Sequence, residues 1–230
     1  MLESLDYSPL PLQPTIVSEP DAVEQRLLSL HETLLPEVFL ESNLRGYEAR
    51  VEVTPSHPPT AAGTLHWHAF VGALRFALAE QGWSTYNHKN CPFVLSPDSR
   101  TSIVVMTGNS DTGKLYGNPT NQAEKGVVLG AAVIRNAQLQ LNLSRRAGAS
   151  GAVREGTQVW VLLYHVELGI KGVLEIRSEL SLPSVFQKRK IESWTERIIL
   201  RPIRPDYDTQ LLEPLPSQPF DVSVERKTAT

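Results

Sequence analysis

The feature that most constrains this sequence is the run from 158 to 201, which contains three strand-length segments joined by short connections. In the middle segment apolar residues alternate with charged ones, so that one face of the strand would be apolar and the other polar. Short connections favour antiparallel neighbours. The run therefore predicts an antiparallel meander with one face covered by helices and the other open to water or to a partner. The three segments are 158–167, 173–182 and 191–201.

Two further segments have strand patterns. Residues 47–53 alternate without error between apolar and charged side chains, which is typical of a half-buried strand. Residues 102–107 contain the run Ile103-Val104-Val105-Met106, whose β-branched side chains suit a strand that is covered on both faces. We expect the second segment to lie near the centre of the sheet.

Three segments have helical patterns. Ser18 and Pro20 provide a start signal for a helix over 19–35, which Pro36 should end. Apolar residues at helical spacing predict a second helix, and capping-box spacing at 121–124 ahead of an apolar stretch predicts a third. The continuation of the third at 137–143 fits either a strand or a helix. The further helices are expected over 65–81 and 121–136.

Prolines are concentrated near the two ends of the chain, and glycines lie in its middle. Of 17 prolines, 13 lie within 1–59 or 202–230, whereas all 14 glycines lie between Gly46 and Gly172. Proline-bearing ends without a core favour extended arms. We therefore expect a single α+β domain, 18–201, between arms at 1–17 and 202–230. Its sheet is expected to be mainly antiparallel, with the meander joined by strands near 47–53 and 102–107, and with two or three helices packed on one face.

The cellular compartment is constrained by three absences in the sequence. Cys91 is the single cysteine, so no intrachain disulfide can form, which favours a reducing compartment. The acidic N-terminus lacks the basic and apolar regions of a secretory signal. The longest apolar runs fall far short of the roughly 20 residues that span a bilayer. These observations predict a cytoplasmic location and no membrane partner.

The strongest candidate site is the polar loop at 107–121, because loops of this length without structure of their own are usually functional or disordered. Its glycine amides and polar side chains are groups that could bind an anion or a polar segment of a partner. The alternative is a self-packed or mobile turn. The candidate ligand-binding residues are Thr107, Gly108, Asn109, Asp111, Gly113, Lys114, Asn118 and Asn121.

The glycine and lysine spacing of this loop matches a phosphate-binding P-loop, but its context does not. The mechanism needs a hydroxyl after the lysine and a helix N-terminus facing the phosphate. Here Leu115 replaces the hydroxyl, and Gly117 and Pro119 fall where the helix should form. A binding site for a phosphate or a nucleotide remains an alternative function, and we expect no bound cofactor.

Charge is distributed unevenly along the chain. Residues 1–41 contain eight acids and one base, whereas 187–204 contain six bases and two acids. The two segments are expected to form solvated faces that attract one another. The cluster Lys188, Arg189 and Lys190 is a candidate for binding nucleic acid through its phosphates, although no aromatic platform accompanies it.

Metal-binding and catalytic patterns are incomplete. Two histidines that are two positions apart, His66 and His68, point to nearly opposite sides of the expected helix. His88 and Cys91 alone are too few for a zinc site. Pro97-Asp98 matches the first half of a metal-dependent nuclease signature whose second half is missing. We expect no metal site and assign no catalytic residue.

The order of segments resembles that of uncharacterised bacterial proteins. The resemblance lies in Ser96-Pro97-Asp98 followed by Thr107-Gly108-Asn109, and in the run from Glu179 to Pro183 followed by Trp194-Thr195-Glu196-Arg197. It implies no activity, and no residue role is taken from it.

Taken together, the sequence favours a non-enzymatic cytosolic accessory protein that binds a protein partner through its arms and an open sheet face. The alternatives are phosphate or nucleotide binding at 107–121 and nucleic-acid binding at 188–190.

Overall fold

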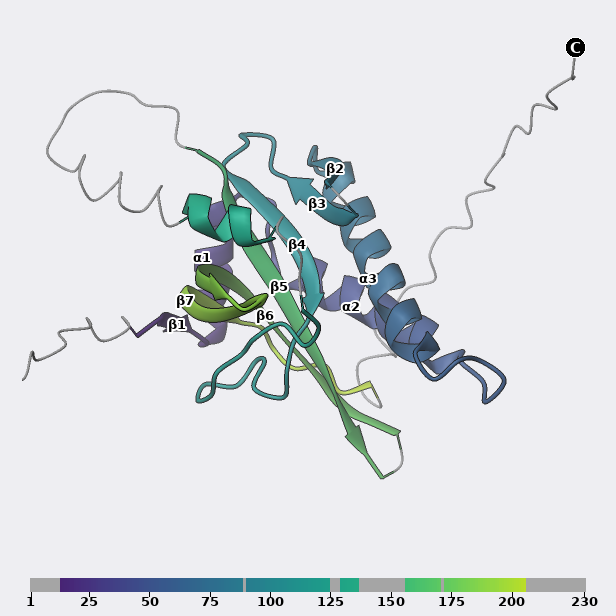
Figure 1. The fold of residues 1–230 in the computed structure, drawn as a ribbon. Helices are drawn as coiled ribbons and strands as arrows, with labels where there is room; N and C mark the ends of the chain where they lie inside the picture. The colour runs from purple at the N-terminus through teal and green to yellow at the C-terminus, as the bar shows by residue number, and fades with distance from the viewer. Residues whose placement is uncertain (1–12, 89, 125–128, 137–155, 171, 206–230) are drawn as a thin grey trace, which may run out of the picture.

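The computed structural model describes residues 13–88, 90–124, 129–136, 156–170 and 172–205. In this part of the chain seven strands form one sheet and four helices pack against it (Figure 1). The helices are α1 (Pro20–Leu30), α2 (Pro36–Val51), α3 (Ala61–Glu80) and one at 129–136. The strands are β1 (Thr15–Val17), β2 (Ser84–His88), β3 (Cys91–Leu95), β4 (Thr101–Thr107), β5 (Gln158–Gly169), β6 (Gly172–Gln187) and β7 (Lys190–Ile199).

The sheet is mixed, so the prediction of a mainly antiparallel sheet is wrong. Its strand order is β1-β7-β6-β5-β4-β3-β2. The meander β5-β6-β7 is antiparallel as expected, but β4 runs parallel to β5 and β1 runs parallel to β7. A parallel pair requires the connecting chain, here 108–157, to return to the starting end of the sheet. The alternation of apolar and polar residues along a strand indicates which side chains lie on each face of the sheet. It does not indicate whether the neighbouring strand runs parallel or antiparallel.

Helices cover both faces of the sheet, which corrects the prediction of two or three helices on one face. Helices α1, α2 and α3 pack on the face that contains Trp160, Leu180 and Ile198. The helix at 129–136 packs on the opposite face, where Leu129 and Val133 contact the side of β5 that contains Val161 and Leu163. The sheet is therefore the middle layer between two hydrophobic cores.

The predicted strand at 47–53 is also wrong, because these residues belong to α2 and the turn that follows it. Seven residues of alternation are too few to outweigh the helical pattern upstream, in which Phe39, Asn43 and Gly46 are buried at spacings of four and three. Pro36 begins α2 rather than ending α1, since a proline at the first helical position loses no hydrogen bond.

One further predicted strand and one predicted helix are present in the structure. The strand near 102–107 is confirmed as β4, and the helix at 65–81 is confirmed within α3. The helix expected over 121–136 is described at 129–136, whereas Asn121 forms a β-bridge with Gly108. Residues 137–143 lie outside the described residues. Of the two arms, the structure describes 13–17, which includes β1, and 202–205, where Ile203 bridges to Ile176.

Helices α2 and α3 approach most closely at Gly46. A Cβ atom at this position would lie 2.5 Å from Cδ2 of His66 and 2.9 Å from its carbonyl oxygen. His66 is fully buried, donates from Nε2 to Oδ1 of Asn43 at 2.8 Å, and stacks on Tyr164 with the ring centroids 4.7 Å apart. The missing side chain at Gly46 therefore makes room for a polar cluster in the core.

Replacing Gly46 by alanine is expected to destabilise the protein by about 1–3 kcal/mol, because the added methyl group must displace His66 or separate the two helices. Chemical denaturation checks this value. The control is Gly72→Ala in α3, where the added Cβ has no atom within 4 Å. Alanine is the better helix former, so the control should gain about 0.5–1 kcal/mol. Equal changes in unfolding free energy for the two substitutions would contradict the close approach of α2 and α3 at Gly46.

Candidate functional site

The predicted loop at 107–121 lies against the polar face of β6 and β7 and is held there by a buried ion pair. Arg197 and Glu179 are 2% and 0% exposed, and the guanidinium donates to both carboxylate oxygens at 2.6 and 3.1 Å. The same carboxylate accepts from the amide of Gly113 at 2.8 Å, and Arg197 donates to the carbonyl of Lys114 at 2.8 Å. The sheet face that was expected to be open is covered by this loop.

Arg177 attaches the loop at a second point. Its guanidinium donates to the carbonyls of Thr112 at 3.0 Å and Ser110 at 2.9 Å. It also pairs with Glu175 at 2.7 Å and with Glu167 at 3.0 Å, and the hydrogen bond to Glu167 holds the pKa of that carboxyl group below its usual value. Two of the charged residues that alternate along β6, Arg177 and Glu179, thus bind the loop directly.

The amides of this loop that resemble a phosphate cradle donate to acceptors within the protein. Gly108 donates to the carbonyl of Tyr164 at 2.7 Å, and Thr112 donates to that of Asn109 at 3.1 Å. Lys114 donates to the carbonyl of Asp111, and Asn118 donates to the Asp111 carboxylate at 2.9 Å. These four amides therefore already have acceptors within the protein. Thr107, at the start of the loop, is the last residue of β4.

The tip of the loop is exposed. We define the loop tip as Leu115, Tyr116 and Gly117, which follow Lys114 and precede Asn118. The Tyr116 side chain is 89% exposed and that of Leu115 is 49% exposed. A large aromatic residue thus projects from a segment whose base is held by buried charges.

The basic cluster at 188–190 lies beside the other end of this loop. Lys188 and Arg189 form the β6–β7 turn with positive φ angles of 46° and 64°. Lys190 donates from Nζ to the carbonyls of Asn121 and Gln122, at 2.6 Å each. Asn121 in turn accepts from the amide of Ile191 at 2.9 Å and donates to the carbonyl of Arg189 at 3.1 Å. The structure thus brings two separately predicted candidates together.

His66, His88, Cys91 and Asp98 lie apart from the loop at 107–121, whereas His165 of β5 donates from Nδ1 to the carbonyl of Gly108 at 3.2 Å. His66 is in the core, His88 and Cys91 face each other across β2 and β3, and Asp98 accepts from Ser96 in the β3–β4 turn. Among the described residues, no three His, Cys, Asp or Glu side chains gather as a metal site would require.

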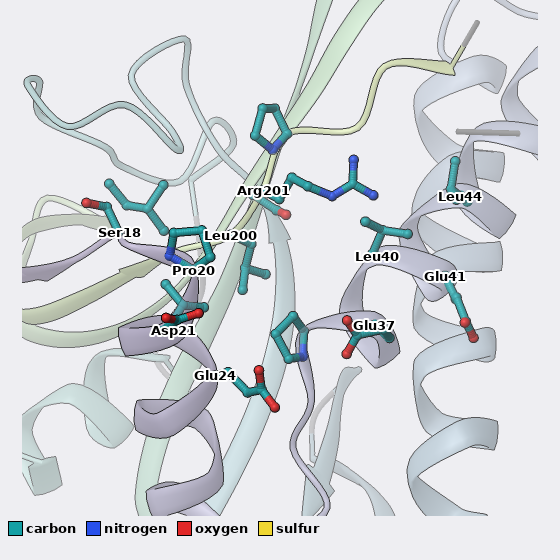
Figure 2. A pocket seen from close by; sticks show the side chains of 15 residues that line it. Ser18, Pro20, Asp21, Glu24, Glu37, Leu40, Glu41, Leu44, Leu200 and Arg201 are labelled. Carbon is teal, nitrogen blue, oxygen red and sulfur yellow. The ribbon is translucent and has the colours of Figure 1, made fainter. Parts of the chain in front are cut away.

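A cleft of about 660 Å³ lies on the other face of the sheet, between α1, α2 and the chain that leaves β7 (Figure 2). We call it the acidic cleft, because four of its 15 lining residues are acidic and one, Arg201, is basic. The acids are Asp21 and Glu24 from α1 and Glu37 and Glu41 from α2.

The acidic cleft also has an apolar lining. Buried side chains of Val23, Leu44 and Leu200 contribute to it, and Leu40 lies between the acids of α2 (Figure 2). The site combines apolar surface with four carboxylates that are exposed at its walls. Such a lining suits an apolar ligand that carries positive charge.

The sequence feature that corresponds to this cleft is the uneven distribution of charge along the chain. The acid-rich segment 1–41 supplies all four carboxylates, and the basic segment 187–204 supplies Arg201. The uneven charge predicts only two solvated faces that attract one another. This charge distribution could not identify a cleft. The two segments are far apart in the sequence and meet only because β1 pairs with β7, and such a pairing has no signature in the local sequence.

The comparisons with known proteins identify no relative: no family model, no curated protein and no solved structure matches the chain. None of the helices that the structure describes is both long and apolar enough to cross a membrane.

Proposed function

We propose that this protein is a non-enzymatic interaction protein, and that its acidic cleft binds a segment of a protein partner in which lysine or arginine lies beside apolar side chains. The observation that carries the proposal is the cleft lining, which has a net charge of −3 over an apolar, buried floor. Complementary charge provides specificity and fast association, whereas apolar burial provides affinity.

The chain's own terminal segments are poor ligands for this cleft. Residues 1–12 contain two acids and no base, and 206–230 contain five acids and two bases. Both segments are thus net negative and would be repelled by four carboxylates. A cationic segment from another chain is the better occupant. A cytosolic location is part of the proposal, and its support is Cys91, the single cysteine.

The other two functions have weaker support. Loop amides and the Lys190 amine donate to protein acceptors, so a phosphate or a nucleic acid would have to compete with them. The two terminal segments, being net negative, would not compete with a cationic ligand for the acidic cleft.

Binding is expected for an acetylated Lys-Leu-Lys-Leu peptide amide and not for its Glu-Leu-Glu-Leu counterpart. Fluorescence anisotropy with labelled peptides measures both affinities. The affinity of the first peptide should fall as salt is added, because the Debye length shortens from about 10 Å at 0.1 M to about 3 Å at 1 M. The double substitution Glu37→Lys/Glu41→Lys should lower it at least tenfold, since each change replaces an attraction by a repulsion.

The matched control is Glu32→Lys/Glu80→Lys. It makes the same change in net charge at two exposed acids that do not line the cleft. Binding by the control should equal that of the unmodified protein within about twofold, because neither side chain lines the cleft and exposed charges are screened by salt. Equal losses in both double variants would refute the acidic cleft as the binding site.

A further inference from the structure

The loop tip is held in place on both sides. On one side, Arg197 donates to the carbonyl of Lys114 at 2.8 Å. On the other, the amide of Asn118 donates to the Asp111 carboxylate at 2.9 Å, and Asn109 donates to the carbonyl of Asn118 at 2.9 Å. Gly117 has a φ of 142°, and a Cβ there would lie 2.9 Å from Cγ of Asp111. The chain on either side of Leu115 and Tyr116 is thus held by contacts within the protein.

Such a tip has the properties of an interface anchor. Tyrosine is enriched among the residues that dominate binding energy, and a group that is already ordered loses little entropy when it binds. The tip and Lys114 before it also present a defined chemistry: one cation next to one aliphatic and one aromatic side chain. This is the chemistry that the proposed function assigns to the ligand of the acidic cleft.

Within one molecule the tip cannot reach the cleft. The loop lies on the face of β6 that carries Arg177 and Glu179, whereas Ser178 of the same strand lines the cleft on the opposite face. The sheet therefore separates the two surfaces. Contact between them requires two copies of the chain.

We infer that the loop tip of one copy binds in the acidic cleft of a second copy. The inference rests on the proposed function, because it names the partner of the same cleft. Lys114 would lie near Glu37 and Glu41, while Leu115 and Tyr116 would cover the apolar floor. A cleft of about 660 Å³ is of the size that holds a ligand of several tens of atoms, which exceeds these two side chains.

The contact joins two different surfaces, so it is heterologous. After one contact forms, the first copy still has an empty cleft and the second still has a free tip. Such contacts add copies until a ring closes, or continue as an open chain. The area covered by one tip is small, and the association is accordingly expected to be weak and concentration-dependent.

Two variants with complementary defects test this arrangement. Leu115→Ser/Tyr116→Ser removes the tip, and Glu37→Lys/Glu41→Lys alters the cleft; all four side chains are exposed, so folding should be preserved. Sedimentation velocity should detect association of the unmodified protein at about 0.5 mM, where even millimolar affinity is visible. Each variant alone should be monomeric. An equimolar mixture should form one-to-one pairs and nothing larger, because each pair uses the last functional tip and the last functional cleft.

The matched control is Phe76→Ser on α3, which removes an exposed aromatic side chain, 52% accessible, away from both surfaces. Its association should equal that of the unmodified protein. The inference is overturned if the unmodified protein stays monomeric, or if either variant alone still associates. If the protein is monomeric but the Lys-Leu-Lys-Leu peptide binds, the inference fails and the proposed function stands. If the peptide does not bind either, both fail.

Discussion

Replacing Glu179 by glutamine is expected to lower the free energy of unfolding by about 3–5 kcal/mol, because the substitution leaves the Arg197 guanidinium buried without a counter-charge. The carboxylate accepts hydrogen bonds from Arg197, from the amide of Gly113 and from the hydroxyl of Ser181. The amide oxygen of glutamine can replace one carboxylate oxygen but supplies no charge. Urea unfolding followed by tryptophan fluorescence measures the loss.

The control for this substitution is Glu124→Gln. It removes one partner of an exposed pair, in which the Arg189 nitrogen lies 3.1 Å from the Glu124 carboxylate and both side chains are at least 60% accessible. Exposed pairs contribute about 0–1 kcal/mol, so the control should be nearly neutral. A loss at Glu179 no larger than that of the control would contradict the buried network. Proteolysis within the loop should also increase in Glu179→Gln, because Gly113 loses a charged acceptor.

Stability is expected to fall steeply as the pH is lowered below about 6.5, and His66 is the cause. Burial is the main reason why the pKa of His66 is lowered from 6.5 to about 3, and the positive charge of Arg50 adds to it. Between these two values the unfolded chain binds a proton at this histidine and the folded chain does not. The unfolding free energy therefore decreases with falling pH by about 1.4 kcal/mol per unit, and by about 5 kcal/mol over the whole interval.

The variant that isolates this effect is His66→Gln, whose side chain does not titrate and keeps a donor for Asn43. Its stability at pH 7 should be lower, because the stacking on Tyr164 is lost. Between pH 6.5 and 4, however, its unfolding free energy should depend less on pH than that of the unmodified protein, by about 1.4 kcal/mol per unit. Denaturant titrations at several pH values give both slopes. Parallel slopes would mean that His66 titrates normally in the folded state.

The sequence predicted those parts of the fold in which a pattern is long and local. The meander β5-β6-β7 and α3 are of this kind: alternation over ten or more residues, or an apolar stripe over several turns, leaves little ambiguity. At 47–53 the pattern was too short, and tertiary packing against α3 decided in favour of a helix. The parallel pairs could not be predicted, because they depend on where a connecting segment returns to the sheet.

The candidate site was predicted only in part, and for a similar reason. Composition identified the loop at 107–121, but its contacts are with Arg177, Glu179 and Arg197, which lie more than 60 residues further along the chain. Those charges were assigned to an open face because alternation cannot tell solvent from a polar loop. The acidic cleft was missed altogether, since its residues come from both ends of the described chain.

The pairing of β1 with β7 ties the timing of the proposed binding to protein synthesis. Thr15 lies opposite Glu196, and Arg26 of α1 pairs with the same glutamate at 2.6 Å. A ribosome adding about 5–20 residues per second needs roughly 10–40 s to reach β7 after β1 has been made. Until then α1 lacks its contacts with β7, and the acidic cleft lacks the wall formed by Ile199–Pro202. A partner that recognises the cleft would therefore bind only chains in which β7 and the residues after it have been made and have joined the sheet.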